Sequence, residues 1–151
     1  MSEKRNVIAE IEAAYKELRT AVEGVPPNRM TDVFYDQWSA KDLVAHTASW
    51  DEFTAADFQR IGRGHVPLIV AFKESEVNDW NGFFMRPRKM FPLEQVLFES
   101  SHWHAALMDV LKGLPDAAFD PGVLANVCVI LHSHLREHAG NIRAWRERQG
   151  I

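Results

Sequence analysis

The chain contains little cysteine and no long apolar run. Its single cysteine, Cys128, excludes an internal disulfide and a cysteine-based zinc cluster, and it is typical of a reducing compartment. No run of about 18 apolar residues occurs, which argues against a transmembrane helix. The first residues begin with charge and lack the apolar core of a secretory signal. We therefore expect a cytoplasmic protein with no membrane partner.

The chain also has no excess of positive charge. The 17 Lys and Arg residues are outnumbered by 21 Asp and Glu residues, so the formal net charge is −4. Proteins that bind the phosphate backbone need clustered positive charge, so we expect no nucleic-acid partner. A chain of 151 residues, with 46% hydrophobic and 25% charged residues, is typical of an ordinary globule. Its length suits one domain that spans residues 1–151.

Four segments show the apolar spacing of amphipathic helices, and none alternates convincingly like a strand. Ser39 is a good N-cap for the second, and Asp42 three residues later resembles a capping box. These elements predict an all-α protein, a four-helix bundle. The expected helices cover residues 2–23, 40–61, 92–112 and 123–149. The expected stripe of the third consists of Leu93, Leu97, Ser100, His104, Leu107 and Leu111.

The segment between the second and third helices is long enough for a crossover connection. Pro67 and the apolar residues after it are expected to open a short helix, which would end at residues 78–82. Residues 86–89, with Arg86, Arg88 and Lys89, are expected to form an exposed loop.

Three of the seven histidines occupy the apolar stripes of the predicted helices. His134 and His138 are four residues apart, so both point to one side of the last helix, and His46 lies on the stripe of the second. An unpaired buried polar group costs roughly 1–3 kcal/mol, and one divalent metal would satisfy all three rings. Alternatively, each ring forms a hydrogen bond to a neighbouring helix. Three nitrogen ligands would leave a coordination position open, as in catalytic sites, and would suit zinc, nickel, copper or iron.

Other residues are secondary candidates for this site. His104, on the stripe of the third helix, is a fourth ligand, a proton-transfer group or, as we favour, a core residue. Trp50 and Trp145 flank the histidines in helical register and are candidates for the walls of a pocket. Asp42, Asp51, Asp57 and Glu137 are candidates to orient the ligand rings, although each is more often a solvated charge. We expect His65, His102 and His132 to be exposed or at a boundary, and Cys128 to be a buried, inert thiol.

Two motifs carry a resemblance to a known family. Residues 38–46 read WSAKDLVAH and residues 134–138 read HLREH. They resemble the W-S-x-K-D-x-x-x-H and H-x-x-x-H motifs of the DinB (damage-inducible) superfamily of four-helix bundles, in its ClbS/DfsB-like branch. The likeness spans nearly the whole chain. Leu135 stands where the branch often has an aromatic residue, and Ile130-Leu131 stands where it usually has Asn-Thr.

The resemblance implies a metal, often zinc or nickel, on His46, His134 and His138, and it implies a homodimer. Related proteins act as thiol-dependent transferases or isomerases, and the branch includes a hydrolase that detoxifies a reactive natural product. The leading hypothesis is therefore a metal-dependent hydrolase or thiol-dependent transferase that acts on a small reactive molecule. The alternative is a metal-independent bundle that binds or sequesters a small molecule for self-resistance. A protein-interaction module is a weaker third hypothesis.

Overall fold

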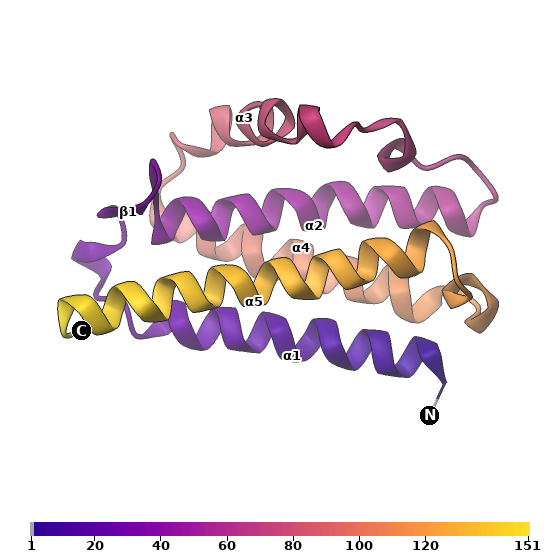
Figure 1. Ribbon diagram of the computed structural model, residues 1–151, viewed down its shortest axis with the longest axis horizontal. Helices are drawn as coiled ribbons and strands as arrows, with labels where there is room; N and C mark the ends of the chain where they lie inside the picture. Colours follow the sequence, from indigo (N-terminus) through magenta and orange to yellow (C-terminus); the bar gives the residue numbers. More distant parts are fainter. Residues whose placement is uncertain (1) are drawn as a thin grey trace. The chain divides into compact units, whose positions relative to one another are not determined.

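The computed structural model describes residues 2–151, which are all-α apart from one short hairpin (Figure 1). The four long predicted helices are confirmed, and their ends differ from the predicted ends by at most one residue. A fifth, shorter helix lies in the connection between α2 and α4. None of these helices combines the length and the apolar character that crossing a bilayer requires. The helices are α1 (Glu3–Glu23), α2 (Ala40–Gly62), α3 (Val77–Arg88), α4 (Leu93–Gly113) and α5 (Val123–Gln149).

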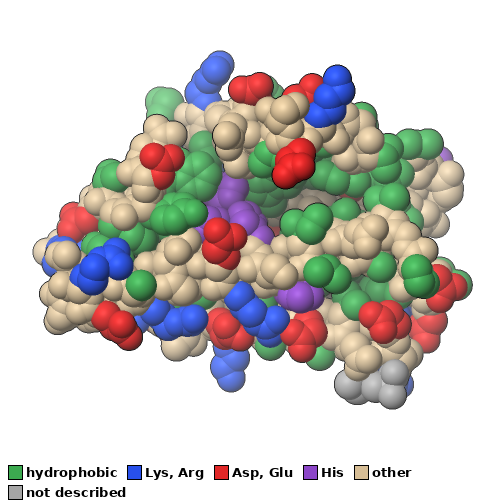
Figure 2. All heavy atoms as spheres, in the orientation of Figure 1, with side chains coloured by type: hydrophobic (Ala, Val, Ile, Leu, Met, Phe, Trp, Pro, Cys, Tyr) green, Lys and Arg blue, Asp and Glu red, His purple; other side chains and the backbone are tan. Residues whose placement is uncertain are grey.

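The chain divides into two compact units. The first comprises Met1–Leu43 and Phe119–Ile151, and the second comprises Val44–Ala118. The side chains exposed on the face in Figure 2 include both acidic and basic groups, as the nearly balanced composition leads one to expect.

In the first unit, α1 and α5 pack side by side (Figure 1). Their apolar faces are buried against the core because the 3–4 residue spacing places those residues on one side of each helix. Charged side chains link the outer edges of the two helices. Arg136 of α5 donates to Glu10 at 2.7 Å and to Glu17 at 3.1 Å, both on α1.

In the second unit, a buried carboxylate holds the start of the connection that follows α2. Asp57 is 2% exposed, and it accepts hydrogen bonds from the backbone nitrogens of Leu68 at 2.7 Å and Ile69 at 2.8 Å. Arg60 pairs with the same carboxylate at 2.8 Å. These three contacts give Asp57 a structural role at the start of the connection, and its role in orienting a ligand histidine stays a prediction.

The middle of the chain corrects two sequence predictions. Helix α3 starts at Val77 and runs through residues 78–82, where we expected a short helix to end. Its Trp80 stacks on Phe72 and packs with Phe84, and this aromatic packing outweighs the weak helix propensity of Asn and Gly. Leu68–Ala71 form only a 3-10 turn.

Residues 86–89 do not form the expected exposed loop, because α3 continues to Arg88. The side chain of Arg88 is 12% exposed; it forms a hydrogen bond with Glu52 of α2 and lies 3.7 Å from Glu99 of α4. Arg86 and Lys89 are exposed, as expected.

A short antiparallel hairpin, which the sequence analysis did not predict, precedes α2. Strand β1 (Val33–Tyr35) pairs with β2 (Trp38–Ser39), and Asp36 in the turn has a φ of 51°. Strands of two or three residues are too short to show an alternation of apolar and polar side chains. A single Asp can adopt a left-handed backbone conformation in a turn, but the residue type alone does not predict one.

The apolar stripe expected on α4 is correct only in its later part. Ser100, His104, Leu107 and Leu111 are buried, whereas Leu97 is 42% exposed. Val96, four residues before Ser100, is buried instead. Both positions fit helical spacing, so the sequence alone could not choose between them.

Candidate metal centre

The two histidines of α5 face each other. The Nε2 atoms of His134 and His138 are 2.8 Å apart, and the ring centroids are separated by 4.4 Å. The spacing of four residues brings both imidazoles to the same side of the helix, as the sequence predicted. At this distance the two nitrogens can share one proton or direct their lone pairs at one ion.

Burial keeps both rings neutral. Desolvation lowers the pKa of His134 to about 4. Desolvation and then the neighbouring His134 lower the pKa of His138 to about 3. Neutral imidazole is the form that binds a metal, so neither ring has to lose a proton near pH 7 before it can act as a ligand.

The hairpin packs against this part of α5. The ring of Tyr35 lies edge-on to His138 with centroids 5.8 Å apart, and Phe34 stacks on Trp145 at 4.4 Å. Tyr35 was missed by the sequence analysis because its short strand was missed. The β-favouring run Val33-Phe34-Tyr35, followed by Asp36, was the available signal.

His46 is placed by the start of α2. Asp42 Oδ2 accepts from the backbone nitrogen of Ser39 at 3.0 Å, and Ser39 Oγ accepts from the backbone nitrogen of Asp42 at 3.2 Å. This arrangement confirms the predicted capping box and fixes the first turn of the helix. His46 follows one turn after Asp42 and is 3% exposed.

The three stripe histidines form one group. Ligand-capable atoms of His46, His134 and His138 all lie within 4.8 Å of one another. The expected convergence is therefore present, and the role of these residues as metal ligands stays a prediction.

His104 is placed in the second unit, where it is buried on α4. Its Nδ1 lies 3.8 Å from the Oδ2 atom of Asp51 on α2. Burial raises the pKa of the Asp51 carboxyl to about 8. The histidine that Asp51 faces is therefore His104, and the expected role of Asp51 in orienting one of the three stripe histidines stays a prediction.

The remaining candidates divide between packing and surface roles. Trp50 packs against Phe53 and Phe84, and its Nε1 donates to Asn81 Oδ1 at 2.8 Å. Trp145 is buried against Phe34; a pocket walled by the two tryptophans stays a prediction. Glu137, His65 and His102 are exposed, and His132 is half-buried. Cys128 is fully buried, and burial raises the pKa of its thiol to about 12, as expected of an inert side chain.

Comparison with solved structures shows a shared fold. An uncharacterised protein from Escherichia coli UTI89 superposes with a TM-score of 0.85, covering 98% of this chain and 95% of that one at 15% identity. A protein described as the sibling lethal factor precursor DfsB superposes with a TM-score of 0.81, covering 99% and 97% at 15% identity. No family model and no curated protein sequence matches the chain. The chain therefore has a DfsB-like all-α fold.

Proposed function

We propose that this protein holds one divalent metal, zinc or nickel, on His46, His134 and His138, and that it uses the metal to transform a small reactive molecule. The proximity of three buried or half-buried imidazoles, with ligand atoms within 4.8 Å of one another, is the observation that carries the proposal. The resemblance to the DinB superfamily supports it.

The donor set fits such an ion. A zinc–nitrogen bond of about 2.0–2.1 Å places two tetrahedral nitrogen ligands about 3.3 Å apart. The His134–His138 separation of 2.8 Å and the 4.8 Å limit for the whole group bracket that value.

The protein's own residues would give the site two properties. Three neutral ligands leave the positive charge of the ion uncompensated, and burial of the rings excludes bulk water from their side of it. When bound, a metal in this setting lowers the pKa of a coordinated water or thiol and so supplies a nucleophile near neutral pH. This favours either a hydrolase or a thiol-dependent transferase. We further propose that the protein is cytoplasmic and that it forms a homodimer. Light scattering after size exclusion measures the molar mass and so tests the dimer.

Metal content provides the primary test. Untagged protein should contain about one equivalent of zinc or nickel by elemental analysis, and His134→Gln should contain little. The matched control is His102→Gln, which removes an exposed histidine from α4. Metal at well below one equivalent in the wild type, unchanged in His134→Gln, would contradict the proposal.

The reaction class needs a separate assay. A panel of small electrophiles is incubated with the metal-loaded protein, with and without a low-molecular-weight thiol, and the products are identified by mass spectrometry. A water adduct indicates a hydrolase and a thiol adduct indicates a transferase. Product formation no faster than with His134→Gln would exclude both activities for that panel.

One observation favours a second candidate function, the metal-independent binding of a small molecule. The hydrogen bond of 2.8 Å between His134 and His138 already satisfies one nitrogen of each ring without an ion. Thermal shift separates the two functions, because a ligand that binds only the folded protein stabilises it by an amount that grows with the logarithm of the ligand concentration relative to Kd. Stabilisation by zinc or nickel that disappears in His138→Gln supports the metal site. Stabilisation by organic ligands alone supports the alternative.

A further inference from the structure

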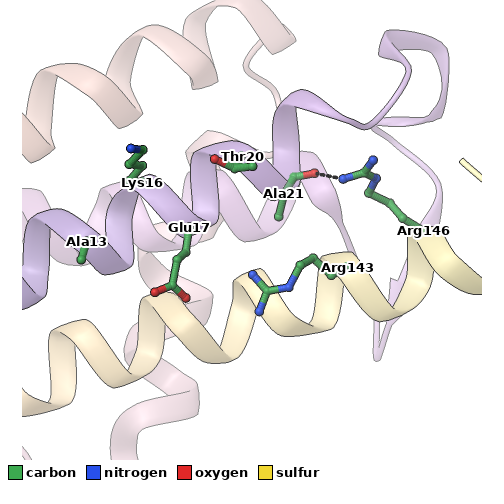
Figure 3. Close-up of a pocket in the computed structure, with 7 residues that line it drawn as sticks. All are labelled: Ala13, Lys16, Glu17, Thr20, Ala21, Arg143 and Arg146. Atoms are coloured by element: carbon green, nitrogen blue, oxygen red, sulfur yellow. Dashed lines mark hydrogen bonds between the residues drawn. The ribbon is translucent and has the colours of Figure 1, made fainter.

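A cavity lies within the first unit, in the groove between α1 and α5 (Figure 3). Its volume is about 380 Å³, which is within the range of small-molecule sites. In Figure 3 the guanidinium of Arg143 extends from α5 toward α1, and Glu17 extends from α1 toward α5. The seven lining residues are Ala13, Lys16, Glu17, Thr20, Ala21, Arg143 and Arg146.

The groove carries a surplus of positive charge. Lys16, Arg143 and Arg146 form no ion pair among residues 2–151, whereas Glu17 is paired with Arg136 at 3.1 Å. Arg136 also binds Glu10, so these residues together comprise four cations and two anions. In a protein with a net charge of −4, such a local excess of positive charge makes this groove attractive to anions.

The side chain of Arg146, which belongs to α5, is held in place by the end of α1. Its Nη1 donates to the carbonyl oxygen of Ala21 at 3.2 Å, and its buried Nε has no hydrogen-bond acceptor. A Cβ added at Gly24 would lie 2.0 Å from this guanidinium. Gly24 has an ordinary helical φ of −81°, so its lack of a side chain serves to make space for Arg146 rather than to permit a special backbone conformation.

We propose that this groove binds a small organic anion, a carboxylate or a phosphate monoester, with its charged group on Arg143 and Arg146. The planar guanidinium provides several donors in a geometry that suits both kinds of oxyanion. Ala13, Ala21 and the aliphatic stems of the longer side chains form an apolar wall for the body of the ligand. This site consists of residues distinct from the three histidines and does not depend on a bound metal.

Titration of the full-length protein with benzoate, phenyl phosphate and inorganic phosphate tests the proposal. Amide chemical shifts are followed by NMR in the presence of an uncharged chelator such as 1,10-phenanthroline, so that binding at the histidines through a metal is eliminated and the chelator does not compete as an anion. We expect saturable shifts in α1 and α5 with one or both organic anions. Affinity should fall about tenfold or more in Arg143→Gln, since a charge-assisted hydrogen bond is lost. The matched control is Arg148→Gln, an exposed arginine on the same helix that does not line the groove.

A second variant tests the role of Arg146 while leaving the arginine in place. Gly24→Ala should displace the guanidinium of Arg146 and lower the affinity for the organic anion by a similar factor. Circular dichroism verifies that the helices remain folded. Shifts from benzoate alone identify a carboxylate site, and shifts from phenyl phosphate alone identify a phosphate site. The proposal is overturned if neither organic anion shifts the groove amides. Equal affinity in Arg143→Gln and wild type would also overturn it, as would inorganic phosphate binding as tightly as phenyl phosphate, the result expected of an adventitious ion only.

Discussion

Acid should destabilise the metal-free protein through the histidine pair of α5. The perturbation is a change from pH 8 to pH 5 in the presence of a chelator. Folding lowers the pKa of His134 to about 4 and that of His138 to about 3, whereas an unfolded histidine has a pKa of about 6.5. Over this pH range the two histidines therefore bind protons in the unfolded chain but not in the folded one. Stability is fully present above the unfolded pKa and is lost as the pH falls toward the folded values.

The magnitude follows from proton linkage. At pH 5 each unfolded histidine gains about 2 kcal/mol from protonation, and the folded rings gain almost nothing, so the pair costs about 4 kcal/mol. Asp51 acts in the opposite direction, because burial raises its pKa to about 8 and the folded protein takes up a proton there. Comparison with a His134→Gln/His138→Gln variant removes that contribution, since Asp51 is common to both proteins.

Urea unfolding followed by far-ultraviolet circular dichroism measures the effect. The stability of the wild type relative to the double variant should decrease by about 4 kcal/mol between pH 8 and pH 5. The matched control is His102→Gln, which removes an exposed ring and should leave this pH dependence unchanged. A relative stability that stays constant over the range would refute the reasoning, because it would mean that both rings accept protons in the folded state as readily as in the unfolded one.

Two further predictions concern buried carboxylates of the second unit. Asp57→Ala should lower the free energy of unfolding by about 2–4 kcal/mol and speed hydrogen exchange at the amides of Leu68 and Ile69, which lose their acceptor; unchanged exchange at these two amides would contradict the role assigned to Asp57. The free energy of unfolding of Asp51→Asn should rise relative to that of the wild type by about 1.4 kcal/mol per pH unit between pH 4 and pH 8. In this range the wild-type Asp51 carboxyl beside His104 keeps its proton in the folded state and loses it on unfolding, whereas Asn does not titrate. A pH-independent difference in urea unfolding would show that the Asp51 carboxyl is already ionised in the folded protein.

The long helices were predictable because their signals are local and repeated. Ser39 and Asp42 cap α2 within four residues of sequence, and the predicted reciprocal hydrogen bonds are formed. Residues 123–149 were predicted as one helix and form one, since apolar residues recur at helical spacing over seven turns of chain. Caps and stripes of this kind need no knowledge of the rest of the fold.

The connection between α2 and α4 was not predictable in detail, because its structure depends on distant partners. Helix α3 is held in place by the stacking of Trp80 on Phe72 and by the ion pair between Arg88 and Glu52. No local sequence pattern predicts these contacts. The turn after α2 depends on Asp57, whose partners lie 11 and 12 residues later. Where tertiary contacts supply the stabilisation, local propensity is a weak guide to the element that forms.

The candidate site shows both the strength of the stripe argument and its limit. His138 and His104 carry the same sequence signal, a histidine where an apolar residue would ordinarily pack, and both are buried. Their surroundings differ: His138 faces the ring of His134, whereas His104 faces the carboxyl of Asp51. The two neutral imidazoles of α5 lie close enough to share one ion, whereas the neighbour of His104 is a carboxyl group whose pKa burial raises to about 8. Helical spacing therefore identifies stripe histidines, but only the fold determines which residue each one faces.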